Sequence, residues 1–342
     1  MSPIRDESPL SDTIAAPDPS LRGGSGAIRF AKTHLVKYGL LIALVVICVI
    51  FALLEPKIFP TWNNAKAILT QAAPLAVVAF GLTLALTMGD FDLSFGPAAG
   101  LCGAAAVVLM SNHGTPWPLA IVLALLIGCA AGAFNGVLVS FLGGTPFIIT
   151  LATGTMFTGV EYLITGQKTI FEGIPESYID IGQSSLVFGI NTQVFVALAV
   201  FILGYLWLSQ SEPGRYMKAI GGSIETARLS GINVRVLRAS GFVAVGIAAA
   251  IAGILLTARG ASSTPAQGVP LLLPAYAGVF LGSTAFRPGQ FNMVGTLVGV
   301  VLLQVLENGL TLVSASPALI NIVQGGVLII AILPSFNASR RS

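Results

Sequence analysis

The stretch SQSEPGRYMKAIGGSIETARLSGINVRVLRA, residues 209–239, is the only long polar passage between hydrophobic runs of this chain. Its basic side chains outnumber its acidic ones: Arg215, Lys218, Arg228, Arg235 and Arg238 stand against Glu212 and Glu225. The apolar runs on either side of it are typical of membrane spans. This stretch therefore marks a place where the chain leaves the membrane and then enters it again.

Local signals in this stretch predict two short helices rather than a slack linker. Pro213-Gly214 marks the start of the first helix, and Gly221-Gly222 breaks the chain away from it. Ser223 is suited to cap the second helix, Glu225 suits the dipole of its first turn, and Gly231 ends it. The second helix would be roughly 10 Å long. Two capped helices at a membrane surface suit the docking of a partner, and the alternative is a capped loop that only maintains topology.

The composition places most of the chain in a membrane. Of its 342 residues, 55% are hydrophobic and 9% are charged, and the mean hydropathy is +0.88, whereas soluble domains carry about 25% charged residues. No basic patch with interleaved aromatic residues occurs outside the loops, so we expect no nucleic-acid partner. The cysteines lie inside apolar runs without metal-ligand spacing, so we expect neither disulfides nor a metal site at Cys48, Cys102 and Cys129.

Ten apolar runs predict an all-α integral membrane protein with about ten transmembrane helices. The runs are Tyr38–Leu54, Ala72–Met88, Phe95–Met110, Trp117–Leu142, Pro146–Thr165, Leu186–Leu208, Ser240–Ala258, Val269–Gly282, Met293–Val313 and Ala318–Leu333. Because Phe95–Met110 and Val269–Gly282 are short, we expect these spans to be broken, tilted or extended. Residues 1–36 predict a disordered cytoplasmic tail, residues 37–335 form the transmembrane domain, and residues 336–342 form a second short tail.

The distribution of lysine and arginine predicts the orientation in the membrane. With the N-terminus inside, the cytoplasmic segments hold the basic residues of the first tail, of residues 209–239 and of the C-terminus. The opposite side then holds few: Lys57, Lys66, Lys168 and Arg259. The positive-inside rule therefore predicts that both termini and residues 209–239 lie in the cytoplasm.

Small residues recur every four positions on two of the predicted helices. Gly128, Gly132 and Gly136 do so on one helix, and Gly295 and Gly299 on another. This spacing lets two helix backbones touch. It favours close packing within one chain, and the alternative is a dimer contact.

Several motifs in order along the chain resemble one known family. They are GDFDLSFG (89–96), TPFIITLATGTMFTG (145–159), EPGRYMKAIGGSIETARLSGI (212–232) and FLGSTAFRPGQFNMVGTLVG (280–299), followed by ENGL (307–310). From about residue 40 to 335 the chain resembles the membrane permease subunits of bacterial ATP-binding-cassette (ABC) importers for ribose, xylose, galactose and similar sugars. The chain departs from the family pattern at Gly89-Asp90-Phe91 and at residues 271–278, where the family commonly has an acidic residue. The substrate therefore stays open.

The resemblance implies a ten-helix fold similar to that of the vitamin B12 importer permease, in the bacterial inner membrane. It also implies three kinds of partner: cytoplasmic ABC ATPase subunits, a periplasmic sugar-binding protein, and a second permease copy in a homodimer around a central path. Residues 209–239 are similar to the family's coupling region, whose short helix docks into the ATPase. By position, this docking role falls on Gly221, Gly222, Glu225, Ala227, Arg228 and Gly231.

Polar residues inside spans are costly and are candidates for the substrate path. Asp90 and Asp92 either cap the helix that begins near Ser94 or belong to a broken helix that faces a cavity. Glu307 is expected toward the outer end of its span, and Glu161 either shares an outer vestibule with it or reaches interfacial water. Neutral polar groups either contact substrate or bond neighbouring helices. The predicted pathway residues are Asp90, Asp92, Ser94, Asn135, Thr150, Glu307 and Asn308.

The sequence contains no Walker A pattern, so we expect ATP hydrolysis on a separate subunit. His34 and His113 lie at opposite flanks of the bilayer, and no catalytic residue or cofactor is predicted. Two alternatives within the same class are a permease for branched-chain amino acids and one for a sugar-derived signal. A different class is an ion-coupled secondary transporter, for which Glu307 and Asp92 would be the acidic residues near the membrane midplane.

Overall fold

The computed structural model describes residues 25–286 and 289–339, with side chains for 38–286 and 289–329. In this part of the chain, seven helices are long and apolar enough to cross a membrane, and three shorter apolar helices accompany them. No strand forms within the same residues, which hold only two isolated bridges. The prediction of an all-α membrane protein with about ten spans is confirmed.

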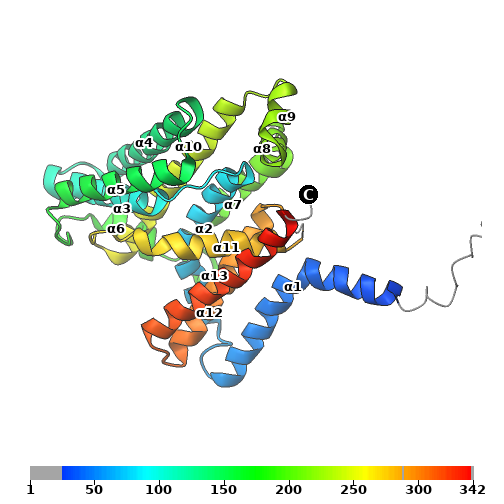
Figure 1. Cartoon of the computed structure of the whole chain (residues 1–342). Helices are drawn as coiled ribbons and strands as arrows, with labels where there is room; N and C mark the ends of the chain where they lie inside the picture. The colour runs from blue at the N-terminus through cyan, green and yellow to red at the C-terminus, as the bar shows by residue number, and fades with distance from the viewer. Residues whose placement is uncertain (1–24, 287–288, 340–342) are drawn as a thin grey trace, which may run out of the picture.

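The helices follow one another in the order that the hydropathy predicts (Figure 1). They are α1 (Ser25–Leu54), α2 (Trp62–Thr87), α3 (Phe95–His113), α4 (Trp117–Gly136), α5 (Pro146–Thr165), α6 (Glu176–Gln183), α7 (Thr192–Tyr205), α8 (Glu212–Gly222), α9 (Ile224–Leu229), α10 (Val234–Gly260), α11 (Leu272–Thr284), α12 (Met293–Leu312) and α13 (Pro317–Ser339). Short π-helical turns extend α4 over Val137–Phe141 and α7 over Leu206–Gln210.

Two segment boundaries differ from the sequence-based expectation, and one expected break is present. Helix α1 begins at Ser25, inside the segment expected to be a tail, while residues 1–24 lie outside the described residues. Helix α13 runs to Ser339, beyond the expected end of the transmembrane domain at residue 335. The short run that begins at Val269 is indeed broken: a 3₁₀ turn over Val269–Leu271 precedes α11, which has 13 residues.

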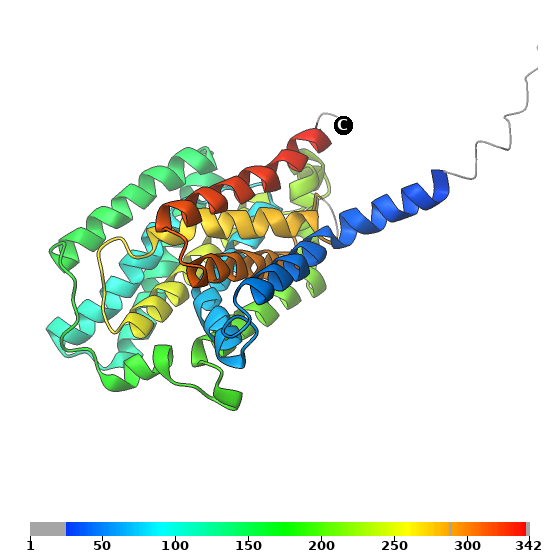
Figure 2. The ribbon, with the colours of Figure 1, turned by 90° about the horizontal axis from the view of Figure 1, so that it is seen from below.

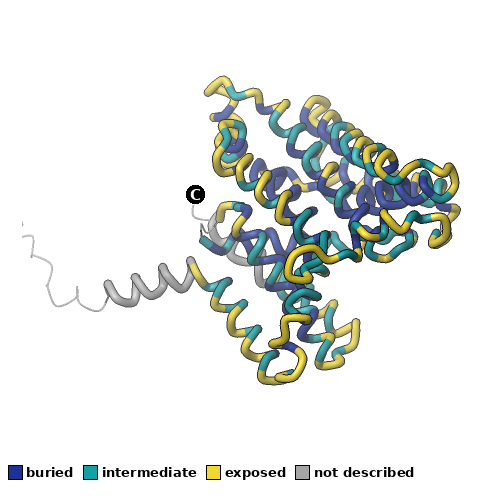
Figure 3. The backbone as a smooth tube through the Cα atoms, turned by 180° about the vertical axis from the view of Figure 1, so that it is seen from behind, coloured by how far each residue is buried: buried dark blue, intermediate teal, exposed yellow. Residues whose placement is uncertain are grey.

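Helix α10 is the centre of the bundle, and it packs against α2, α3 and α4. Figure 1 shows it between α4 and α2, and Figure 3 shows that buried residues concentrate along these central helices. The α4–α10 contact depends on glycine. A Cβ added at Gly132 would overlap the carbonyl oxygen of Phe242, and one added at Gly246 would overlap that of Gly128. The predicted close packing of the α4 glycines within one chain is therefore confirmed.

A second group of helices packs beside this centre. Helices α11, α12 and α13 lie side by side in Figures 1 and 2, and α1 packs on α12. Gly278 and Gly282 of α11 meet Gly299 and Gly295 of α12, backbone against backbone. The two small-residue pairs set the close approach of these helices, as the spacing on α12 predicts.

Candidate functional site

The polar stretch that joins α7 to α10 folds as the two capped helices that its sequence predicts. The Ser211 side chain caps α8 and accepts a hydrogen bond from Gly214 N at 3.1 Å. The Ser223 side chain caps α9 and accepts one from Thr226 N at 3.2 Å. Gly231, just beyond α9, has a φ of 81°, a left-handed conformation that favours glycine. The two helices, α8 and α9, are therefore defined by local sequence.

This α8–α9 segment is anchored on one side and exposed on the other. Met217, Ile220 and Ala227 are buried, and Gly221 packs against the carbonyl oxygen of Thr87 at the end of α2. In contrast, the side chains of Glu225 and Arg228 are 70% and 64% exposed and lie 3.7 Å apart. A hydrogen bond from Tyr216 to the Glu212 carboxylate raises the pKa of the Tyr216 hydroxyl. A pair of helices that is fixed to the bundle on one side and carries charged side chains on its solvent side suits a surface that another protein binds.

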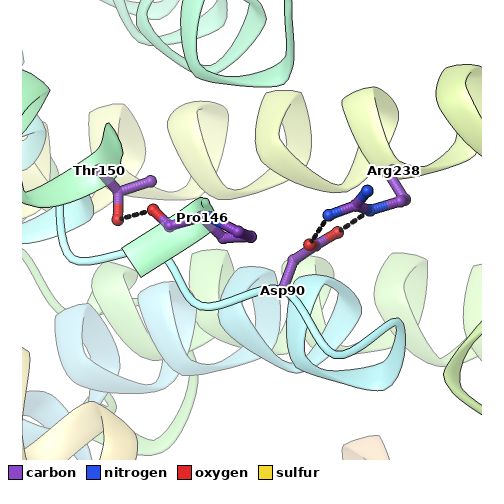
Figure 4. Close-up of polar contacts among 4 residues, drawn as sticks. All are labelled: Asp90, Pro146, Thr150 and Arg238. Atoms are coloured by element: carbon purple, nitrogen blue, oxygen red, sulfur yellow. Dashed lines mark hydrogen bonds and ion pairs between the residues drawn. The ribbon is translucent and has the colours of Figure 1, made fainter. Parts of the chain in front are cut away.

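A loop of residues 88–94, in which Met88, Asp90, Asp92 and Ser94 are buried, connects α2 to α3 and lies next to this segment. We call it the connecting loop. Its Asp90 is 1% exposed and forms a two-pronged ion pair with Arg238 of α10, as Figure 4 shows. The distances are 2.9 Å from Nε to Oδ2 and 2.5 Å from the terminal guanidinium nitrogen to Oδ1. Because a buried carboxylate needs a counter-charge, Arg238 is what allows Asp90 to lie there.

Hydrogen bonds tie the rest of the connecting loop to three further helices. Leu93 N donates to Thr150 Oγ1 of α5 at 2.9 Å, and Asn135 of α4 donates to Ser94 Oγ at 2.7 Å. The hydroxyl of Tyr276, on α11, donates to the Asp92 carbonyl at 2.8 Å and accepts from Asp92 N at 3.0 Å. These contacts hold the loop against α4, α5 and α11.

Asp92 makes its own side-chain contacts inside the connecting loop. Its Oδ1 accepts hydrogen bonds from Ser94 N at 2.7 Å and from Ser94 Oγ at 2.6 Å. This arrangement lies directly before the first residue of α3, Phe95. It fits the interpretation that an acidic residue organises the start of that helix.

A groove of about 560 Å³ opens between α5 and the start of α11. We call it the α5–α11 groove. Its lining is mostly apolar, with the polar side chains of Thr155, Thr158 and Tyr162 along α5, and it contains no charged side chain. The lining residues are Leu93, Pro97, Leu151, Gly154, Thr155, Thr158, Gly159, Tyr162, Val269 and Leu272. A neutral ligand with hydroxyl groups matches this lining better than a charged one.

Comparison with known proteins assigns the chain to a family. The model of the family described as "Branched-chain amino acid transport system / permease component" matches residues 64–332. The ribose import permease protein RbsC of Escherichia coli (strain K12) is 34% identical over 314 residues, which are 90% of this chain and 96% of that protein. The chain belongs to this family of import permeases. The resemblance to ABC sugar-importer permeases that its motifs indicate is thereby confirmed.

Two further relatives of this permease carry other substrate names. The galactofuranose transporter permease protein YtfT of Escherichia coli (strain K12) is 33% identical over 303 residues, covering 86% of this chain and 87% of its own. The autoinducer 2 import system permease protein LsrD of Escherichia coli O9:H4 (strain HS) is 30% identical over 306 residues. These residues are 87% of this chain and 92% of LsrD.

The permease fold brings five of the predicted pathway residues together and leaves two apart. Asp90, Asp92, Ser94, Asn135 and Thr150 all meet at the connecting loop. Glu307 and Asn308 lie on α12, where Glu307 accepts from Gln324 of α13 at 3.2 Å. None of the seven lines the α5–α11 groove, and their contact with substrate stays a prediction. Asp92 is bonded to Ser94 within the connecting loop, and Glu307 is bonded to Gln324 between α12 and α13, so each acidic group has its own partners.

Sequence reasoning missed Arg238 and Tyr276 as site residues of the permease. Arg238 contributed to the sequence interpretation only as one of the basic residues that indicate topology. The signal that points to it is Asp90 and Asp92, since two acidic groups at the end of a span require a cation or donors nearby. The partners of Asp90 and Asp92 cannot be read from the chain, because Arg238 lies 148 residues from Asp90 and Tyr276 lies 184 residues from Asp92.

Glu161 of α5 holds the segment that leads to Val269, one of the residues that line the α5–α11 groove. Its side chain is fully buried, and its Oε1 accepts a hydrogen bond from Ala266 N at 2.9 Å, while its Oε2 has no partner among the described residues. Ala266 belongs to the segment that leads from α10 to Val269, a lining residue. Glu161 therefore holds this segment against α5 and does not reach interfacial water, which was the alternative interpretation.

We expect the Glu161→Ala variant to lose about 1–3 kcal/mol of stability, because the partly buried Ala266 N–H is left without its acceptor. Thermal unfolding in detergent and hydrogen exchange at Ala266 would measure the loss. The control is Glu172→Ala, since Glu172 is an exposed glutamate and should change stability by less than about 0.5 kcal/mol. Wild-type melting and wild-type protection at Ala266 in the Glu161 variant would contradict this role.

Proposed function

We propose that this chain is the membrane-spanning subunit of an ATP-driven importer that translocates a monosaccharide, a pentose or a hexose, delivered by a periplasmic binding protein. The similarity to permeases named for ribose and galactofuranose supports a sugar. The observation that carries the proposal is the lining of the α5–α11 groove, which has hydroxyl groups but no charged side chain.

The same observation weighs against the branched-chain amino acids named in the family description. An amino acid carries an ammonium and a carboxylate group, and burying either without a partner charge is costly. A sugar is neutral, and its hydroxyls can bond to those of Thr155, Thr158 and Tyr162. A sugar-derived signal is the second candidate, because one relative is named for autoinducer 2.

In this proposal a second copy of the chain faces the α5–α11 groove and encloses the path. Helix α5 leaves large apolar side chains uncovered beside the groove, including Leu151, Met156 and Leu163. Glu307 and Asn308 would lie toward the periplasmic side, where sugar enters. Both termini and the α8–α9 segment would lie in the cytoplasm, as the positive-inside rule indicates.

The ATPase subunits would bind the α8–α9 segment. The exposed Glu225 and Arg228 would contact the ATPase, while Gly221 lets α8 lie against the end of α2 and Gly231 allows the left-handed turn after α9. Gly222 ends α8 with open space around it and is assigned no contact in this proposal. Ala227 is buried, so its part is to hold α9 in place. Several kcal/mol are needed to shift such a protein between two states, and nucleotide binding to the partners would supply them.

The test is transport into proteoliposomes that contain this chain with an ABC ATPase and a sugar-binding protein that form a complex with it. We expect ATP-dependent uptake of one labelled sugar among ribose, xylose and galactose, and no uptake of leucine. A Glu225→Arg variant should abolish sugar-stimulated ATP hydrolysis and leave the permease folded. Uptake of leucine alone would exclude the sugar assignment, and accumulation without any ATPase subunit would exclude an ABC importer.

A further inference from the structure

The connecting loop touches the α8–α9 side of the permease at two points. Gly221 of α8 packs against the carbonyl oxygen of Thr87, the last residue of α2, and against Met88, the first residue of the loop. Arg238 lies near the start of α10, shortly after α9, and forms the ion pair with Asp90. The connecting loop is therefore in direct contact with α8 and with the start of α10.

The other side of the loop touches the walls of the α5–α11 groove. Leu93 lines the groove, and its N–H is bonded to Thr150, one residue before the lining residue Leu151. Thr150 in turn donates to the carbonyl oxygen of Pro146 in the first turn of α5, as Figure 4 shows. The second wall of the groove is α11, which begins at the lining residue Leu272. The hydroxyl of Tyr276, on this helix, bonds to the backbone of Asp92.

The loop is rigid enough to transmit a displacement. Asp90, Asp92 and Ser94 are all at most 2% exposed. Phe91 stacks on Tyr276 and Phe280 of α11, with ring centroids 6.0 Å and 6.3 Å apart. Buried, hydrogen-bonded elements move as units, because close-packed interiors do not deform continuously.

We propose that the connecting loop transmits movement of the α8–α9 segment to both walls of the α5–α11 groove, and that Arg238 is the positioning residue that locks the loop to the moving helices. This inference rests on the proposed function, since the movement comes from the partner ATPase. It assigns Asp90, Asp92, Ser94, Asn135 and Thr150 to coupling rather than to sugar contact. Arg238 acts through Asp90 and touches no substrate.

The variant that tests the proposal is the double replacement Asp90→Asn with Arg238→Gln. It removes both charges of the pair together, so that no uncompensated charge is left buried, and it keeps a polar side chain at both positions. The matched control is Arg235→Gln, which removes one positive charge from the exposed side of the first turn of α10. All variants carry alanine in place of Cys48, Cys102 and Cys129 and a single reporter, Thr155→Cys, in the groove.

The measurement is the rate at which a membrane-impermeant thiol reagent labels the reporter in the full complex, with and without ATP. In the permease with the native ion pair and in the Arg235 control, we expect ATP to change this labelling rate by about fivefold or more. A fivefold change corresponds to a free-energy difference of about 1 kcal/mol. In the double variant, whose melting temperature should match that of the control, the ATP response should vanish. The double variant should also import at least tenfold less sugar for each ATP hydrolysed.

The labelling does not require that the substrate be known, so the outcomes separate the two proposals. An unchanged ATP response in the folded double variant would overturn the role of the connecting loop. No ATP response with the native ion pair would overturn it as well, because the groove would then not follow the α8–α9 segment. A normal labelling response without uptake of any sugar would overturn only the proposed substrate class.

Discussion

Replacing Gly221 by alanine is expected to reduce sugar import by about tenfold or more. A Cβ at this position would overlap the carbonyl oxygen of Thr87, and a backbone atom cannot rotate out of the way as a side chain can. Overpacking of this kind costs typically about 1–3 kcal/mol, and the α8 end must lift from α2 to relieve it. Because about 1.4 kcal/mol corresponds to a factor of ten, we expect sugar uptake to fall by about tenfold or more.

The matched control for Gly221 is its neighbour. A Cβ at Gly222 would meet nothing within 4 Å, and its φ lies outside the left-handed range. The Gly222→Ala variant should therefore transport like the natural chain. Uptake and sugar-stimulated ATP hydrolysis in proteoliposomes would compare the two variants. Equal activities would show that the contact between α8 and α2 does not matter for coupling.

The second large effect is expected at the centre of the bundle, where the Gly246→Ala variant should fail to form a stable permease. A Cβ there would overlap the carbonyl oxygen of Gly128 and would lie 2.9 Å from the backbone nitrogen of Gly132. The facing residues on α4 are themselves glycines, so no side chain can move aside. Helices α4 and α10 must separate, and we expect a loss of more than about 3 kcal/mol.

The fraction of monodisperse protein after detergent extraction and its melting temperature would measure this loss. The control is Gly325→Ala on α13, where an added Cβ would meet nothing within 4 Å. Since alanine favours a helix over glycine by about 1 kcal/mol, this control should be neutral or slightly stabilised. If both variants melted alike, the α4–α10 contact would not be the close packing that we describe.

Much of the fold was predictable because it depends on local chemistry. Hydropathy alone located the ten apolar runs, since only helices satisfy their backbone groups inside a bilayer. The caps at Ser223 and Gly231 and the break at Gly221-Gly222 predicted α9 and the end of α8, because these signals act over three or four residues. Glycine spacing predicted close packing on α4 and α12, although not which helices would be the partners.

The interpretation of the polar residues was weaker for a related reason. A polar side chain in a span can serve a path or a partner, and the sequence does not distinguish the two possibilities. The structure shows that Asp90 is paired with Arg238. It also shows that Thr150 is bonded to the backbone of Leu93 and of Pro146. The groove lies along Thr155 and Thr158, which fall within the motif of residues 145–159, and along Tyr162 just beyond it; none of the three is among the predicted pathway residues.

The sequence by itself determined what lies within a few residues of each position: the membrane-spanning helices, their order, and the two capped helices between α7 and α10. Only the tertiary structure decided which distant groups meet, namely Arg238 with Asp90, Tyr276 with Asp92, and Glu161 with Ala266. The physical reason is range. Capping and hydropathy act over one turn or one span, whereas a buried charge or amide takes whichever partner the packing of the whole bundle brings to it.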